Sequence, residues 1–185
     1  MKYEQYALGD VLQFWFEELT PQDWFAGGVE LDAKITERFA DVHARVAAGE
    51  FAQYRTDAHS HLAEVIVLDQ FSRQIYRNAA PAFVYDYLAL ALAQHAIAAG
   101  FDQQLENDAR MFLYMPFMHS ESSMIHTDAV KLFEALGNVE TLKFEHIHKD
   151  IIDEFGRYPH RNETLGREST TEEKDYLANN QEAFF

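Results

Sequence analysis

The chain has 185 residues, of which 48% are hydrophobic and 25% are charged, and its formal net charge is -16. This length and apolar content are sufficient for one domain spanning residues 1–185. The negative charge argues against sequence-independent binding to nucleic acid or to anionic membranes, because both require a basic surface. The sequence contains no cysteine, which excludes disulfides, thiolate nucleophiles and cysteine-based zinc sites.

Targeting and cofactor signals are absent from the sequence. The first residues, MKYEQYALGDVLQ, lack a basic region followed by an apolar run, and no stretch approaches the roughly 20 apolar residues that cross a bilayer. We therefore expect a cytoplasmic protein. The spacings typical of nucleotide loops, zinc proteases and EF-hands are also missing. We expect neither a cofactor nor a bound metal, and the oligomeric state stays open.

Apolar residues recur at helical spacing along nearly the whole chain, so strands are not required. Asp10 is placed to cap a first helix, and a second helix ends at Gly49. A third helix runs from about Asp57 into the seventies. Pro81 is placed in the first turn of a fourth helix that ends at Gly100, since proline there lacks only a donor that would be unpaired anyway.

The second half of the chain continues the helical pattern. A fifth helix, from about residue 105, contains Pro116, which predicts a kink or break just before His119. Two further helices end at Gly137 and Gly156, and a capping box opens the last helix at residues 170–173. About eight helices with short connections predict an all-α fold of stacked antiparallel pairs.

Asp69 and Arg73 form a charged pair on an apolar face of the third helix. At about 100° per residue, they share that face with Leu62, Ile66 and Tyr76. Two interpretations remain open: a buried ion pair that ties helices together, or a ligand-facing pair with Gln70 and Arg77 nearby.

The histidines divide by their position on the helices. His148 lies at the edge of an apolar face formed by Phe144, Ile147, Ile151 and Phe155, so it is a candidate general base. His146 and Asp150 have metal-chelating spacing, but they lie on the polar face and we do not assign a metal to them. The remaining residues of this type are expected to be ordinary helix-surface or core-edge histidines; these are His43, His59, His61, His95 and His126.

The tripeptide His119, Ser120, Glu121 follows the segment RMFLYMPFM. A serine hydrolase triad is assembled from separated segments, and no G-x-S-x-G elbow is present, so we do not infer one here. Ser120 is expected to be the N-cap of the following helix. His119 and Glu121 remain candidates for general base and its carboxylate partner.

Arginine is concentrated in residues 148–170, HKDIIDEFGRYPHRNETLGREST. Its planar fork suits carboxylate or phosphate, so Arg157, Arg161 and Arg167 predict an anionic partner beside His160 and Asn162. Internal carboxylates can pair with some of these arginines. We expect at least one arginine to face an accessible pocket instead.

Four motifs in this order, WFEEL, LDQFSRQIYR, RMFLYMPFMHSE and the arginine-rich segment, resemble the bacterial family known as domain of unknown function 924. The family motif D-Q-F-P-R-N-I-Y-R falls on residues 69–77, with Ser72 in place of proline and Gln74 in place of asparagine. The resemblance implies a fold similar to tetratricopeptide-like superhelices, and it implies no assigned activity.

Three functions remain open for these residues. The first is binding of an anionic small molecule or acidic peptide in an arginine-lined pocket with aromatic walls. The second is a hydrolase or transferase in which His119, His148 or His160 acts as general base beside Glu121 or Asp69. The third is an internal polar network with a purely structural role. The candidate ligand-binding residues are Asp69, Gln70, Arg73, Arg77, Tyr114, Arg157, His160, Arg161, Asn162 and Arg167.

Overall fold

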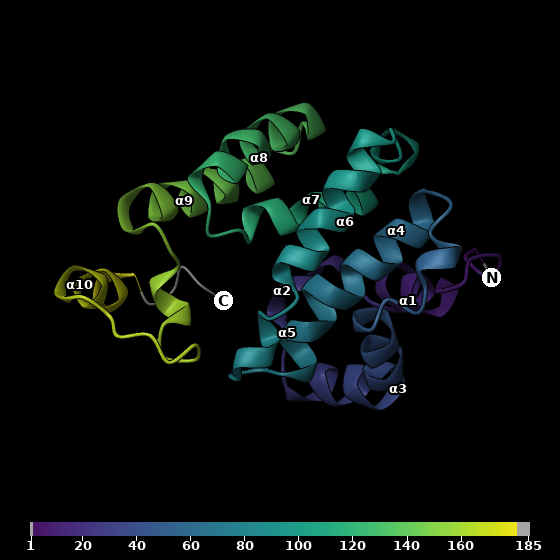
Figure 1. Ribbon diagram of the computed structural model, residues 1–185, viewed down its shortest axis with the longest axis horizontal. Coiled ribbons are helices and arrows are strands. Elements are labelled where there is room, and N and C mark those ends of the chain that lie inside the picture. Colours follow the sequence, from purple (N-terminus) through teal and green to yellow (C-terminus); the bar gives the residue numbers. More distant parts are fainter. Residues whose placement is uncertain (1, 181–185) are drawn as a thin grey trace.

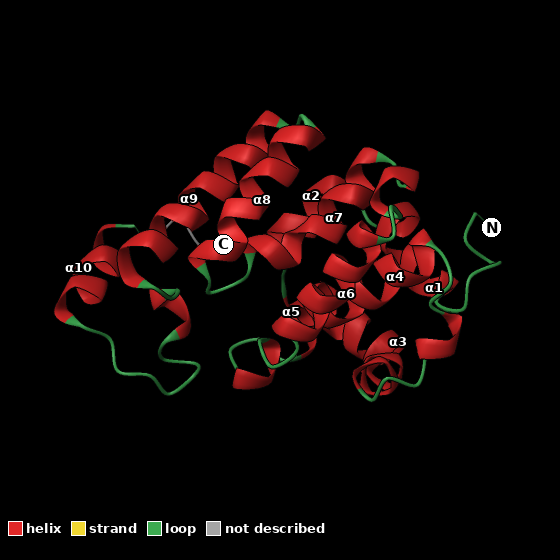
Figure 2. Ribbon diagram, turned by 45° about the horizontal axis from the view of Figure 1, so that its top comes forward, coloured by secondary structure: helices red, strands yellow, loops and turns green. Residues whose placement is uncertain are grey.

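The computed structural model describes residues 2–180, and in that range all of the regular secondary structure is helical. Figure 1 shows the helices in chain order, and Figure 2 shows that loops make up the rest of the described chain. The all-α fold that the helical periodicity predicts is thereby confirmed. The finer expectation of a tetratricopeptide-like superhelix stays a prediction.

The N-terminal half contains two continuous helices that change type along their length. A π-helical stretch, η1, extends the first helix, and another, η3, joins α4 to α5. The elements are α1 (Gly9–Gln13), η1 (Phe14–Glu18), α2 (Pro21–Ala26), α3 (Val29–Ala47), the short 3₁₀ turn η2 (Ala52–Tyr54), α4 (Ala58–Val65), η3 (Ile66–Phe71) and α5 (Ser72–Ile75).

The C-terminal half contains uninterrupted α-helices joined by short connections, some of which form 3₁₀ turns. Its elements are η4 (Ala80–Ala82), α6 (Asp86–Ala98), η5 (Asp102–Gln104), α7 (Asn107–Met118), α8 (Ser123–Leu136), α9 (Val139–Phe155), η6 (Pro159–Arg161) and α10 (Thr171–Asn179).

Most helices pack on helices close to them in the sequence. α4 contacts α6 and α7, α6 contacts α7, and α7, α8 and α9 follow one another as contacting neighbours. α3 packs on η3 and α5. Figure 1 shows α10 at the end of the molecule opposite the N-terminus. Trp15, Phe71 and Phe112 lie at the centre of the main core, where large aromatic side chains exclude water.

The C-terminal segment has a smaller hydrophobic cluster of its own. Tyr158 packs there with Ile151 and Ile152 of α9, and Phe155 and Tyr176 cover them. This cluster holds the arginine-rich segment against the end of α9. From this position the arginine-rich segment contacts the start of α6 through Arg161.

The third predicted helix is confirmed as the continuous stretch from α4 to α5. The Asp57 side chain accepts hydrogen bonds from the backbone of His59 and Ser60 and so caps its start. The π-helical stretch η3 in its middle was not predicted. Because a π-helix has more residues per turn, simple 100° spacing fails there, and Leu68, Asp69 and Phe71 are all fully buried.

Two predicted helix starts are wrong, and one predicted helix break lies where expected but is not at the proline. Asp10 lies inside the first turn of α1, whose N-cap is Leu8 and has no side-chain hydrogen bond. Pro81 lies in η4, a separate 3₁₀ turn, and α6 begins only at Asp86. α7 continues through Pro116 and ends at Met118, so the chain leaves the helix just before His119, but not at the proline.

Several predicted helix ends are confirmed. Gly137 and Gly156 close α8 and α9 with φ angles of 77° and 70°, a conformation that costs glycine little. Thr170 and Glu173 form the predicted capping box of α10. The local sequence therefore determines where these helices stop.

Candidate functional site

The side chains of His119 and Asp69 contact each other although the two residues are 50 positions apart in the sequence. Asp69 comes from η3, where the wide helical turn places its carboxylate in the core with no exposed surface. His119 is the C-cap of α7, and its side chain is 16% exposed. Its Nδ1 lies 2.7 Å from Oδ1 and 3.0 Å from Oδ2 of Asp69. A carboxylate only accepts, so Nδ1 carries the proton.

The environment keeps Asp69 ionised. Burial raises the pKa of its carboxyl, but the charge of Arg73 and the hydrogen bonds from His119 and Gln70 outweigh burial and lower the pKa to about 2. Burial also lowers the pKa of His119, although Asp69 opposes this effect. His119 is therefore a neutral imidazole at physiological pH. Within the described chain no hydrogen bond engages its Nε2, so the lone pair there is available.

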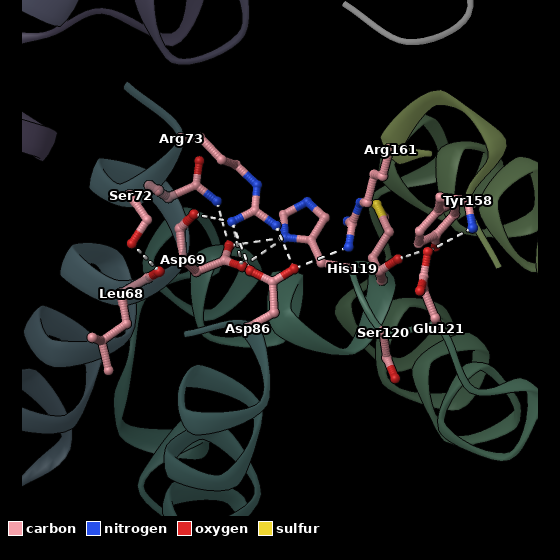
Figure 3. Close-up of polar contacts among 12 residues, drawn as sticks. Leu68, Asp69, Ser72, Arg73, Asp86, His119, Ser120, Glu121, Tyr158 and Arg161 are labelled. Carbon is pink, nitrogen blue, oxygen red and sulfur yellow. Dashed lines mark hydrogen bonds and ion pairs between the residues drawn. The ribbon is translucent and has the colours of Figure 1, made fainter. Parts of the chain in front are cut away.

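Arg73 and Arg161 share one carboxylate beside this pair. Arg73 lies 3.3 Å from Asp69 Oδ1, which confirms the predicted i,i+4 contact, and it also donates to Asp86 at 3.1 Å from each of two nitrogens. Nη1 of Arg161 donates to Asp86 Oδ2 at 3.0 Å. Figure 3 shows this arrangement around Asp86. We refer to Asp69, Arg73, Asp86, His119 and Arg161 as the His119 site.

Two aromatic rings hold the Arg161 guanidinium. Its central carbon lies 4.6 Å from the ring centres of both Phe83 and Tyr158, which is cation–π distance. The side chain is 7% exposed, and burial lowers the pKa of this guanidinium. Nε is buried with no partner in the described chain, and Nη2 makes no hydrogen bond there either. Arg161 therefore keeps donor capacity that Asp86 does not use.

Hydrogen bonds and an ion pair from the C-terminal segment fix the end of α7 and the loop that follows it. The Met118 carbonyl accepts a hydrogen bond from the Tyr158 hydroxyl, and Glu121 accepts from the Tyr158 backbone at 2.8 Å. Glu121 also forms a two-pronged ion pair with Arg167 at 2.6 and 2.9 Å. The prediction that Ser120 is the N-cap of α8 is wrong, because Ser122 occupies that position. The backbone carbonyl of Ser120 instead accepts a hydrogen bond from the His126 ring.

His126 and Glu145 form a buried pair behind this loop. Nδ1 of His126 lies 2.7 Å from Glu145 Oε1, and both side chains have no exposed surface. Nε2 of His126 lies 2.9 Å from the Ser120 carbonyl oxygen. The expectation that His126 is an ordinary surface or core-edge residue is wrong, because its side chain has no exposed surface.

His148 and His160 lie around Tyr158, near the His119 site. Their ring centres are 5.6 and 5.4 Å from that of Tyr158. Burial lowers the pKa of His148 to about 4 and that of His160 to about 3, so both are neutral. Nδ1 of His148 donates to the Phe144 carbonyl at 2.8 Å. Phe144 itself is exposed, contrary to its predicted place on the apolar face of α9.

The other arginines of the C-terminal segment form local ties. Arg157 pairs with Glu173 at 2.6 Å, and Arg167 pairs with Glu121 and donates to Asn162. Asn162 in turn donates to Glu173. These contacts fasten the loop to α10 and to the end of α7. Only Arg161 of this group reaches the His119 site.

Two further candidates lie apart from the site. Arg77 pairs with Asp32 at an exposed position, and Tyr114 donates to Asp102 at 2.7 Å within the core. Gln70 lies next to the site and donates to Asp69 at 2.6 Å. The structure thus brings Asp69, Gln70, Arg73 and Arg161 together near His119, whereas Arg77 and Tyr114 lie elsewhere.

The expectation that at least one arginine lacks an internal partner is also wrong. Arg73, Arg157, Arg161 and Arg167 each pair with a carboxylate. A chain with 31 acidic and 15 basic residues offers carboxylates in excess, so even buried arginines find them. What distinguishes Arg161 is that its carboxylate, Asp86, is shared with Arg73.

Within residues 2–180, no group of three or more His, Asp or Glu side chains is arranged to hold a metal ion. In the same range no helix is both long and apolar enough to span a membrane. A surface cavity of about 210 Å³ is lined by residues of the N-terminal segment, of α4 and of the segment 104–109, among them Tyr3, His59 and Glu106. None of the residues that line it belongs to the His119 site.

The motifs that build the site are those of one bacterial family. The family model described as a bacterial protein of unknown function (DUF924) matches residues 11–181. The chain belongs to this family. A solved structure, that of the protein of unknown function ATU0120 from Agrobacterium tumefaciens, is 37% identical, with a TM-score of 0.88 over 93% of this chain and 97% of that chain. The comparison with curated proteins gave no match.

Sequence reasoning missed three residues of this region of the DUF924 fold: Asp86, His126 and Glu145. Asp86 is the only acidic residue between Asp69 and Asp102, but no motif spacing in the sequence marks its role. His126 and Glu145 lie on α8 and α9, which contact each other. A pairing of the two was foreseeable only from the expectation that consecutive helices form an antiparallel hairpin.

Proposed function

We propose that the His119 site is the active site of a hydrolase or transferase that acts on an anionic small molecule, with His119 as general base. One observation carries the proposal: Nδ1 of His119 is held at 2.7 Å by the buried carboxylate of Asp69, while Nε2 is left without a hydrogen bond in the described chain. This pairing sets the tautomer that leaves the basic nitrogen free.

The chemistry follows from the proton positions. Nε2 accepts the proton of a water or hydroxyl nucleophile as its oxygen attacks the substrate, and the same nitrogen then donates that proton to the leaving group. The imidazolium that exists between these steps is stabilised by the Asp69 carboxylate, which is ionised throughout. His119 is neutral before the reaction because burial lowers its pKa.

Arg161 supplies the contact to the negative group of the substrate. Its guanidinium is fixed by Phe83 and Tyr158, and Nη2 has no partner in the described residues. A carboxylate or phosphate oxygen fits such a donor. Arg73 is already engaged by both Asp69 and Asp86, so we assign it to holding the site together.

The test combines chemical modification with turnover. Diethyl pyrocarbonate reacts with an unprotonated imidazole nitrogen, so we expect it to modify His119 at Nε2. We expect phosphate, sulfate or dicarboxylates to slow this reaction. A panel of carboxylic and phosphate esters is assayed with the wild type and with His119→Asn. Turnover in the wild type that disappears in His119→Asn supports the enzyme.

Matched arginine variants locate the anion. Arg161→Lys keeps the charge but loses the fork, so protection by anions weakens while the fold is retained. Arg157→Lys is the control, since Arg157 pairs with Glu173 away from His119. Equal protection in both variants contradicts the proposed role of Arg161.

A second function, binding of an anionic small molecule or acidic peptide without turnover, is favoured by the free donors of Arg161. Anion protection of His119 without turnover of any ester in the panel supports this second function. The absence of both overturns both functions and leaves a structural network.

A further inference from the structure

We propose that Glu145 and His126 share one proton and act as positioning residues for His119. This inference rests on the proposed function, since it assigns to the pair the task of holding the catalytic loop. The loop consists of His119, Ser120 and Glu121, and the pair reaches it through the Ser120 carbonyl.

The acceptor at Ser120 determines the proton on Nε2. A backbone carbonyl only accepts hydrogen bonds, and the Ser120 oxygen lies 2.9 Å from Nε2 of His126. Nε2 therefore carries a hydrogen. The Tyr158 hydroxyl, 3.1 Å from the same nitrogen, donates to the Met118 carbonyl and so does not need to donate to Nε2.

The contact at Nδ1 then requires one more proton. Glu145 Oε1 lies 2.7 Å from Nδ1, and two bare lone pairs at that distance would repel each other. Either the imidazole is doubly protonated beside a carboxylate, or a neutral imidazole accepts a hydrogen bond from the protonated acid. In both forms the pair is neutral overall and holds one shared proton between Glu145 and His126.

Burial of Glu145 favours the neutral form. Its second oxygen, Oε2, is buried with no partner in the described chain, and an ionised oxygen in that position would be costly. Burial likewise raises the pKa of this carboxyl, against the effects of His126, His146 and Lys149. The pair can thus lie inside the α8–α9 contact without a net charge.

The pair fixes one side of the loop while other groups fix the rest. His126 from α8 binds the Ser120 carbonyl, Arg167 and Tyr158 bind Glu121, and Asp69 binds the His119 ring itself. Figure 3 shows Ser120 and Glu121 directly beside His119 in the same loop. If the His126 contact were lost, the residue next to His119 would lose its link to α8 and α9. The direction of the His119 ring depends on that link.

Nitrogen-15 NMR of the histidine rings in the wild type tests the protonation directly. We expect the spectrum at neutral pH to show a hydrogen on Nε2 of His126, as the contact with the Ser120 carbonyl requires. A neutral ring with hydrogen on Nδ1 and a bare Nε2 overturns the proposal. This readout does not depend on turnover, so failure of the proposed function leaves it unchanged.

Variants test the positioning role. In Glu145→Gln the amide can donate to Nδ1 and preserve the Nε2 hydrogen, so we expect wild-type titration and wild-type modification rate of His119. His126→Phe keeps a planar aromatic ring at this position but removes the hydrogen bonds to Glu145 and Ser120. We expect it to shift the His119 titration and to change its modification rate several-fold.

His43→Phe is the matched control for loss of a buried histidine. His43 is as buried as His126 and hydrogen-bonds Ser72, but it lies away from the loop. We expect it to lose stability in urea while the His119 titration stays unchanged. If His126→Phe behaves like His43→Phe in both measurements, the pair has a purely structural role and the positioning proposal is wrong.

Discussion

Arg161 donates a hydrogen bond to Asp86 at 3.0 Å across 75 positions of sequence. This contact joins the C-terminal arginine segment to the start of α6. Asp86 also binds Arg73, so one carboxylate pairs with a guanidinium 13 residues before it and another 75 residues after it. The geometry of the His119 site depends on it, because Asp86 determines where Arg161 can reach.

Replacement of Asp86 by Asn should destabilise the protein strongly. Asn keeps the size of the side chain but leaves two largely buried guanidinium groups without their shared charge; Asp86 is 12% and Arg161 is 7% exposed. We expect a loss of about 3 to 5 kcal/mol in the free energy of unfolding, measured in urea. Asp32→Asn is the control, since its partner Arg77 is 44% exposed. There we expect a loss below about 1 kcal/mol. Similar losses in the two variants would show that Asp86 is not a buried tie.

Replacement of Asp69 by Ala should also destabilise the fold. The change removes the carboxylate that pairs with Arg73 and receives the His119 hydrogen. Leaving Arg73 buried beside an empty space should lower the free energy of unfolding by about 3 to 5 kcal/mol at neutral pH. A loss below about half a kcal/mol in urea unfolding would contradict a buried pair.

The contribution of Asp69 should depend on pH in a defined direction. Its pKa falls from 3.8 to about 2 in the folded protein, so the stabilisation is fully present above about pH 4 and is lost as the pH falls through about 2. The difference in unfolding free energy between the wild type and Asp69→Asn, measured by urea titration from neutral pH downwards, should shrink in that window. A difference that is constant to pH 2 would show that the carboxyl is not ionised in the folded protein.

His148 and His160 should make the protein less stable in mild acid. Folding lowers the pKa of these rings to about 4 and about 3 from 6.5, so below pH 6.5 the unfolded chain binds protons that the folded chain does not. Stability should therefore fall as the pH drops from 6.5 towards 4. His148→Gln and His160→Gln should each show a shallower dependence in thermal unfolding than the wild type. His146→Gln, at an exposed position on the same helix, should retain the full dependence.

The Tyr158 hydroxyl should contribute measurably to stability. It is buried and donates to the Met118 carbonyl, so Tyr158→Phe leaves that acceptor without its partner. We expect a loss of about 1 to 2 kcal/mol in the free energy of unfolding. Tyr87→Phe, at a position that is 74% exposed, should change stability very little. Equal effects would indicate that the Met118 carbonyl finds another donor.

Features that depend on near neighbours could be predicted from the sequence. The helical periodicity, the glycine ends of α8 and α9 and the capping box at Thr170 follow from hydrogen bonds within a few residues. The contact between Asp69 and Arg73 follows from i,i+4 spacing, and η3 preserves it. The concentration of arginine in residues 148–170 is visible in the sequence, but of these arginines only Arg161 reaches the His119 site.

The partners of the candidate site residues were decided by the tertiary structure. Acidic residues outnumber basic residues by about two to one, so the sequence does not indicate which carboxylate an arginine will contact. Arg161 pairs with Asp86 because η6 and the start of α6 lie next to each other in the fold. The pairing of His119 with Asp69 requires a helix end and a π-helical turn from distant segments to meet in the core. Such meetings are determined by packing over the whole domain, since burial of apolar surface, rather than any local spacing, sets the positions of the helices.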